Sequence, residues 1–207
     1  MNLIIIGPPG SGKGVQSSLI SKYFKIAHIS PGEILREEFE KKTKLGIESE
    51  KYWRNGNLVP DEMILKIVKK RLKQKDCKKG FILDGFPRTL NEAQKFLRFS
   101  KLNKVVLLDI PDKISIKRIT GRRECSKCDA IYSPEIPSKK KGICNKCNGK
   151  LYQREDDSPK VVKNRLKIYH KSINPILNFF QHQKLLVEVN GSGNIENVFK
   201  RIKERLR

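Results

Sequence analysis

The sequence lacks a hydrophobic run long enough to cross a membrane, and no basic leader precedes its first apolar residues. The N-terminal apolar run ends after four residues, Leu3 to Ile6, whereas a membrane-spanning helix needs about 20. A secretory leader combines a basic start with a longer apolar segment. We therefore expect a soluble cytoplasmic protein that has no membrane partner.

Acidic residues are scarce, because 22 Asp and Glu stand against 45 Lys and Arg, which gives a formal net charge of +23. An excess of this size raises nucleic-acid binding as a hypothesis. The lysines are nevertheless scattered along the chain, and Lys139–Lys141 is the only triple. Solvated helix faces explain scattered lysines about as well as a polyanion does. The sequence therefore predicts no dedicated nucleic-acid partner, although small anionic substrates would be attracted.

Disulfides are not expected, since a chain without an export signal stays in a reducing compartment. Four of the five cysteines form two Cys-x-x-Cys pairs that are separated by fifteen residues. Four thiolates at this spacing are typical of a tetrahedral zinc site, so Cys125, Cys128, Cys144 and Cys147 are predicted to bind Zn²⁺. Iron–sulfur ligation or two redox pairs are the alternatives. Cys77 belongs to no motif and is interpreted as a buried core residue.

The start of the chain carries a phosphate-binding motif. The β-branched run before Gly7 predicts a buried strand, and residues 7–13, Gly-Pro-Pro-Gly-Ser-Gly-Lys, match the Gly-x-x-x-x-Gly-Lys signature. In such a loop, backbone N–H groups and the positive end of the following helix point at phosphate oxygens. Lys13 adds a mobile charge. The signature continues with Ser or Thr, but Gly14 and Val15 carry no hydroxyl.

Strands alternate with helices along most of the chain. Apolar runs predict four further strands at 27–30, 80–84, 104–110 and 185–189, and a closing helix at 195–207. This alternation predicts an α/β fold with a parallel five-stranded sheet flanked by helices. Such sheets bind ligands at the carboxyl ends of their strands. Asp84 ends one strand there and is expected to hold Mg²⁺ through water, while Arg88 faces the same crevice.

Taken together, these motifs resemble the adenylate kinases of the long, zinc-lid type, over the whole chain. The resemblance is carried by the loop at 7–14, Asp-Gly-Phe-Pro-Arg-Thr at 84–89, Gly-Arg-Arg at 121–123, the four paired cysteines, and Gln-Arg-Glu-Asp-Asp at 153–157. It implies Mg²⁺-dependent, reversible transfer of the γ-phosphoryl group of ATP to AMP, which gives ADP from both nucleotides. A monomer is expected from the family.

The resemblance also implies a division of the chain. Residues 1–29, 60–120 and 158–207 would form the core P-loop domain, 30–59 an inserted helical segment that binds the nucleoside monophosphate, and 121–157 a small zinc-stapled lid. Closing both pieces over the nucleotides would exclude water. Trp53, in the monophosphate-binding segment, is interpreted as a packing aromatic.

Residue roles follow from the same resemblance. The expected catalytic residues are Lys13, Asp84, Arg88, Arg122, Arg154 and Arg165. The expected ATP contacts are Gly10, Ser11, Gly12, Lys13, Gly14, Val15, Arg118, Arg122, Ile131, Tyr132 and Gly193. The expected AMP contacts are Pro31, Arg36, Asn57, Leu58, Val59, Gly85, Phe86, Pro87, Arg88, Glu92, Arg154 and Arg165. Asp156 and Asp157 correspond to the carboxylates of lid closure.

Four residues depart from the family's usual pattern. Val15 and Pro31 each replace a Thr, and Ser133 replaces a His of the lid. Glu92 stands where the family has the Gln that reads adenine, although Gln94 follows closely. A Gln amide donates to N1 and accepts from N6 of adenine, whereas an ionised Glu only accepts and suits guanine better. AMP is the predicted acceptor; GMP, CMP or UMP, and a zinc-ribbon nucleic-acid-binding protein, are the alternatives.

Overall fold

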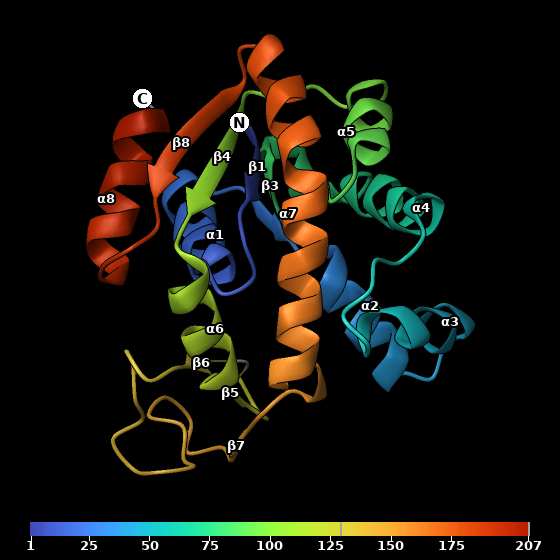
Figure 1. Cartoon of the computed structure of the whole chain (residues 1–207). Coiled ribbons are helices and arrows are strands. Elements are labelled where there is room, and N and C mark those ends of the chain that lie inside the picture. The colour runs from blue at the N-terminus through green and yellow to red at the C-terminus, as the bar shows by residue number, and fades with distance from the viewer. Residues whose placement is uncertain (129, 207) are drawn as a thin grey trace.

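The core of the molecule is a parallel sheet of five strands in the order β2–β3–β1–β4–β8, seen in a computed structural model that describes residues 1–128 and 130–206. The strands are β1 (Asn2–Ile6), β2 (Ala27–Ile29), β3 (Phe81–Asp84), β4 (Lys104–Asp109) and β8 (Leu186–Asn190). Every pair of neighbours in this sheet runs parallel, with Ile5 opposite Asp84 and Ile6 opposite Leu107. The predicted fold class is confirmed (Figure 1).

Helices cover both faces of the sheet, because successive side chains of a buried strand point to opposite sides. Leu3 and Ile5 pack against one pair of helices, while Ile4 and Ile6 pack against another group. The first pair is α1 (Lys13–Phe24) and α8 (Ile195–Leu206); the second group is α4 (Asp61–Leu72), α5 (Leu90–Leu97) and α7 (Pro159–His182). Arg207, the end of the predicted closing helix, lies outside the described residues.

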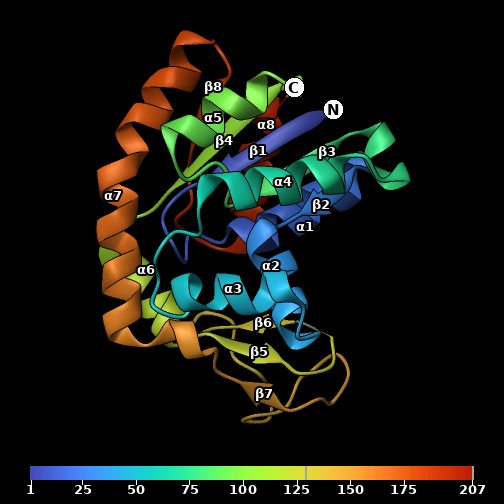
Figure 2. The same cartoon turned by 90° about the vertical axis from the view of Figure 1, so that its right-hand side faces the viewer.

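Two segments lie beyond the carboxyl ends of the strands. The first contains α2 (Pro31–Glu40) and α3 (Lys44–Trp53), which pack on Val59 and Ile67 through Leu35. The second carries its own antiparallel sheet in the order β6–β5–β7, made of β5 (Arg123–Cys125), β6 (Ile131–Tyr132) and β7 (Leu151–Tyr152). Figure 2 shows this small sheet beneath α2 and α3.

The remaining elements are short. A helix α6 (Asp112–Thr120) packs against α7, and 3₁₀ turns η1 and η2 span Lys75–Lys79 and Glu155–Asp157. Among the described residues, no helix combines the length and the apolar character needed to cross a bilayer. The proposed domain boundaries at 29/30, 59/60, 120/121 and 157/158 stay a prediction.

Candidate active site

The loop between β1 and α1 is shaped by glycines in the left-handed region. Gly10 has φ +76° and Gly12 has φ +92°, conformations that disfavour residues with a Cβ. A Cβ at Gly10 would come within 2.9 Å of the Ser115 carbonyl oxygen, so the loop packs closely on α6. A Cβ at Gly12 would meet no atom within 4 Å among the described residues, its chain neighbours aside. The loop is therefore packed against α6 at Gly10 and has free space beside Gly12.

Lys13 turns back over this loop. Its Nζ donates hydrogen bonds to the carbonyl oxygens of Gly7 and Pro8, both at 2.8 Å, and to Ser11 Oγ at 3.3 Å. Burial lowers the pKa of Lys13 to about 7, against the opposing attraction of Asp84. A lysine amine that is buried among neutral carbonyls favours its charged form when an anion arrives beside it. Lys13 therefore lies where a bound anion would stabilise its charge.

Asp84 lies next to the loop, because β3 pairs with β1 and ends where the loop begins. Its side chain is 13% exposed, and its Oδ2 lies 3.5 Å from His28 Nε2. A Cβ on Gly14 would be 3.3 Å from the same oxygen. Gly14 therefore leaves space beside a half-enclosed carboxylate oxygen, the kind of ligand that Mg²⁺ prefers, often through water.

A cavity lies against α2 and α3, and Gly85, which follows Asp84, is part of its wall. Its wall combines apolar side chains with three arginines, and it is lined by Pro31, Gly32, Leu35, Arg36, Trp53, Gly56, Asn57, Leu58, Val59, Ile64, Gly85, Arg88, Glu92, Asp156 and Arg165. Nine of the residues that the sequence predicts as AMP contacts are in this set. The guanidinium groups of Arg36 and Arg88 both approach Gly32, within 3.6 and 3.8 Å of where its Cβ would be.

Three of the predicted AMP contacts do not line this cavity. Phe86 is buried in the main core, with its ring 5.4 Å from that of Phe96, and Pro87 follows it. Arg154 instead bonds to Glu33 at 3.0 Å and is held by both oxygens of Glu124. Phe86 thus belongs to the core next to the cavity, and Arg154 belongs to the lid.

Glu92 lies in the cavity wall and is only 2% exposed. Its Oε2 accepts a hydrogen bond from the Arg88 backbone N–H at 2.6 Å, and its own N–H donates to Thr89 Oγ1 at 3.0 Å. This reciprocal pattern resembles the capping box of helix N-termini. Burial raises the pKa of Glu92 to about 7, although the hydrogen bond from Arg88 acts in the opposite direction.

Two buried carboxylates form ion pairs with arginines near the cavity. Asp156 Oδ2 accepts from Arg36 Nη2 at 3.0 Å and from Arg165 Nη1 at 3.3 Å, while Arg122 forms a bidentate pair with Asp157 at 2.7 and 2.5 Å. Burial by itself would raise the pKa of Asp156, but the surrounding arginines outweigh it and hold that pKa below its ordinary value. The predicted closure carboxylates thus neutralise arginines of the predicted transfer site.

Ion pairs also join the lid side to the α2–α3 segment. Arg154 bonds to Glu33 on α2, and Arg54 after α3 bonds to Glu155 on η2 at 2.9 Å. Arg36 reaches Asp156 from the same side. Segments that are more than a hundred residues apart in sequence therefore meet over the site.

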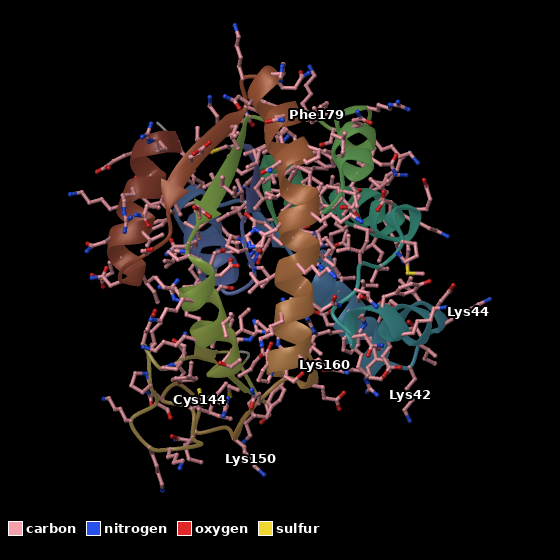
Figure 3. All side chains as sticks on the ribbon, in the orientation of Figure 1. Lys42, Lys44, Cys144, Lys150, Lys160 and Phe179 are labelled. Atoms are coloured by element: carbon pink, nitrogen blue, oxygen red, sulfur yellow. The ribbon has the colours of Figure 1, made fainter. Side chains whose placement is uncertain are left out.

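The four lid cysteines converge as predicted. Their Sγ atoms all lie within 4.8 Å of one another, and Figure 3 shows Cys144 inside this segment. Backbone N–H groups of Lys127 and Lys146 donate to Cys125 and Cys144 at 3.4 and 3.3 Å. The Tyr132 hydroxyl, 3.3 Å from Cys144 Sγ, lowers the pKa of that thiol. This donor set fits a tetrahedral Zn²⁺, whose ligands are thiolates.

The predicted ATP contacts outside the loop come from α6, from the lid and from the turn between β8 and α8. Arg118 donates to the Gly193 carbonyl at 3.5 Å and pairs with Glu135 at 2.8 Å. Ile131 is exposed, whereas the Tyr132 hydroxyl is used inside the lid, where it also accepts from Asn145 N–H at 2.7 Å. Val15 lies on the first turn of α1 without a hydroxyl to offer.

Sequence reasoning missed several residues of the site. Trp53 is interpreted from the sequence as a packing aromatic, and it does pack on Phe39. It also lines the cavity, and its buried Nε1 has no hydrogen-bond partner within residues 1–128 and 130–206. Glu33 and Glu124 carry no motif, and their pairing with Arg154 becomes visible only after folding. An aromatic residue at the end of a polar helix was the only signal for Trp53.

The comparisons with known proteins agree over most or all of the chain. A family model described as Adenylate kinase matches residues 5–185. An adenylate kinase of Clostridium acetobutylicum is 45% identical, with 100% of this chain and 99% of that protein covered. The adenylate kinase of Clostridium tetani is 43% identical over 98% of this chain and 96% of its own length, and that of Caldicellulosiruptor saccharolyticus is 43% identical over 100% and 99%.

Proposed function

This chain belongs to the adenylate kinase family and is a nucleoside monophosphate kinase that transfers a phosphoryl group from ATP to AMP; we propose how its own residues divide that work. The observation that carries the proposal is the juxtaposition of two anion sites. An open glycine loop with Lys13 lies beside a cavity that is lined by Arg36, Arg88 and Arg165. One site would hold a donor triphosphate and the other an acceptor monophosphate.

On the donor side, the loop from Gly10 to Val15 would bind the β- and γ-phosphates through backbone N–H groups, and Lys13 would move from the loop carbonyls to phosphate oxygens. Arg118, Arg122, Ile131, Tyr132 and Gly193 would contact ATP from α6, from the lid and from the turn between β8 and α8. Asp84 would hold Mg²⁺ through water, and the cation would neutralise the phosphate charge. With no hydroxyl at Gly14 or Val15, this placement depends on Asp84 and the phosphates.

On the acceptor side, the apolar wall would hold the base and the arginines would hold the phosphate. Leu35, Val59 and Ile64 supply that wall, and Arg36, Arg88 and Arg165 supply the charge. Pro31, Asn57, Leu58, Gly85, Phe86, Pro87 and Glu92 complete the proposed AMP site. Phe86 and Pro87 would contribute through their backbone, because the Phe86 side chain belongs to the core.

Transfer would proceed by alignment and charge stabilisation. An acceptor phosphate oxygen attacks the γ-phosphorus in line, and the bond to the β-phosphate oxygen breaks, so no side-chain nucleophile or general base is needed. The transferring group carries negative charge, which Lys13, Arg88, Arg122, Arg154 and Arg165 would stabilise together. Asp156 and Asp157 would hold Arg122 and Arg165 in place until phosphates replace the carboxylates, and Glu33 and Glu124 would do the same for Arg154.

The lid would keep water away from the reacting phosphates. Residues 121–157 are too few for a substantial core of their own, so a structural Zn²⁺ on the four cysteines would keep the segment folded. We infer a cytoplasmic monomer without a dedicated nucleic-acid partner, whose ligands are ATP, AMP and ADP.

The direct test is a phosphotransfer assay with Mg²⁺·ATP and each of AMP, GMP, CMP and UMP. We expect ADP to form from ATP and AMP, and the reverse reaction to start from ADP alone. Salt-dependent RNA or DNA binding without phosphotransfer would contradict the proposal and favour the zinc-ribbon alternative.

A further inference from the structure

We propose that the protonation state of Glu92 selects the base of the acceptor nucleotide, with the neutral acid reading adenine and the carboxylate reading guanine. This inference rests on the proposed use of the cavity as the acceptor site. It assigns to a buried titratable residue a choice between two purine substrates.

The orientation of Glu92 is fixed by the start of α5. Thr89 is the N-cap, and Glu92 is the third residue of the helix. The Arg88 N–H donates to Glu92 Oε2 at 2.6 Å, while the Glu92 N–H donates to Thr89 Oγ1. The carboxyl group cannot turn away from this position without leaving an N–H of the helix start unpaired.

The same hydrogen bond decides where a proton would sit. Oε2 is an acceptor to a backbone N–H at 2.6 Å, so a proton on the carboxyl group must reside on Oε1. Protonation therefore changes Oε1 from an acceptor into a hydroxyl donor, whereas Oε2 remains an acceptor in both states. A neutral Glu92 then presents one donor and one acceptor in a plane, as a carboxamide does.

Glu92 feels the charge of Arg88 but, in the described part of the chain, makes no salt bridge to the arginines that a phosphate would use. It lines the cavity with Arg36, Arg88 and Arg165, yet within residues 1–128 and 130–206 it forms no ion pair with any of them. If the arginines take the phosphate, the carboxyl group is left to face the base, beside the apolar wall of Leu35 and Val59. A polar group in an otherwise apolar pocket fixes ligand identity.

Adenine and guanine require different hydrogen-bonding partners. Adenine offers the N1 lone pair next to the N6 amino group, which matches one donor and one acceptor, as the neutral acid provides. Guanine offers N1–H and the N2 amino group, which match two acceptors, as the carboxylate provides. A mismatch leaves a buried polar group unpaired and costs affinity.

The surroundings make both forms accessible near neutral pH. Burial raises the pKa of Glu92 to about 7. The Arg88 N–H, the charge of the Arg88 guanidinium and the Thr89 N–H lower it, whereas Asp61 at the start of α4 raises it. Arg36 on α2, Asp156 on η2 and Arg165 on α7 line the same cavity as Arg88. Because the pKa is raised above that of a free Glu, the neutral form dominates below about pH 7 and the carboxylate above it.

The experiment measures kcat/KM for AMP and for GMP, with Mg²⁺·ATP in excess, between about pH 5.5 and 8.5. Both acceptors carry the same phosphate group, so its titration cancels in the ratio of the two values. We expect kcat/KM for AMP to be level below pH 7 and to fall above it, and that for GMP to rise up to pH 7 and to level off above it, so that the AMP-to-GMP ratio falls by about tenfold for each pH unit across the range. A ratio that stays constant over the range overturns the proposal.

The matched control is Glu92→Gln, whose amide oxygen can still accept from the Arg88 N–H. This variant should prefer AMP with a ratio that does not depend on pH. Trp53, the only tryptophan of the chain, lines the cavity and reports AMP binding by fluorescence without turnover, and the Kd for AMP should rise with pH only in the wild type.

The outcomes separate the two proposals. If no monophosphate is phosphorylated at any pH, the proposed function fails. If AMP is phosphorylated with a pH-independent preference over GMP, only the role of Glu92 fails. Should Glu92→Gln not fold, the wild-type ratio decides alone.

Discussion

Lys13 is the residue whose ionisation responds most directly to the donor nucleotide. Its pKa is lowered to about 7 by burial among loop carbonyls, whereas that of a free lysine is about 10.4. A bound triphosphate supplies the missing negative charge and raises this pKa. At a pH between these two pKa values, we expect Lys13 to be largely neutral in the free enzyme and charged in the complex with ATP.

We therefore expect the enzyme to take up a proton, at most one, when it binds ATP at about pH 8. Calorimetric titration in two buffers that differ in ionisation enthalpy measures this number. Lys13→Met is the control and should take up none. Equal heats in both buffers for the wild type would contradict the assignment.

The same substitution tests the catalytic role of Lys13. Removing a donor aimed at the transferring charge should lower kcat by at least about 100-fold. The melting temperature should stay the same or rise, because the substitution removes a partly buried amine, and burial of such a group costs free energy. Near-normal turnover by Lys13→Met would refute the role.

At the scale of elements, the contact between α7, η2 and the lid depends on buried ion pairs. Asp157 is fully buried and is held by Arg122 through two hydrogen bonds. Removing one charge from such a pair leaves the other uncompensated.

Asp157→Asn should thus destabilise the protein by about 3 kcal/mol in urea unfolding. The matched control is Glu37→Gln, which breaks the exposed pair between Glu37 and Lys41 at 3.8 Å and should cost less than about 0.5 kcal/mol. If both substitutions lowered the free energy of unfolding equally, the buried pair would contribute no more to stability than the exposed pair.

The lid should depend on its metal. Purified protein should contain Zn²⁺ at one ion per chain, and chelation should first remove the hydrogen-exchange protection of residues 123–152, before the core sheet is affected. Cys144→Ser should have the same effect without a chelator, whereas Cys77→Ser, at a buried thiol outside the cluster, should keep the metal. A melting curve unchanged by chelation would show that the four cysteines need no ion.

For the whole molecule, the net charge of +23 acts at long range on anionic substrates and on the protein itself. Steering raises the rate of encounter with nucleotides, and repulsion among the lysines lowers stability. Both effects are screened by salt, with a Debye length of about 10 Å at 0.1 M.

Raising KCl from about 0.02 to 0.3 M should therefore lower kcat/KM for AMP several-fold while the melting temperature rises. Stopped-flow or steady-state kinetics and thermal unfolding at each salt concentration measure the two trends. A kcat/KM that is insensitive to salt would mean that encounter is not assisted by charge.

Much of the fold was readable from local pattern. The five strands, the phosphate loop and the four-cysteine site each occupy a short stretch whose composition and spacing have few physical alternatives. Leu3–Ile6 must be buried on both faces, and a lysine that follows glycines at fixed spacing needs an anion. In the small lid sheet, Tyr132 lies opposite Arg123 and Cys125 opposite Leu151. Strands of two or three residues are too short for a periodicity to be detected in the sequence.

What only the tertiary structure decided is which charges meet. Arg36 and Asp156 are 120 positions apart in the chain, and Arg154 meets Glu33 over a similar separation. The sequence alone indicated the phosphate-binding loop with Lys13, the candidate arginines and the unusual Glu92, because these features depend on residue type and local spacing. The pairing of the arginines with buried carboxylates, and the burial and helix-cap bond that move the pKa of Glu92, depend on dielectric surroundings and distances that exist only once the chain is packed.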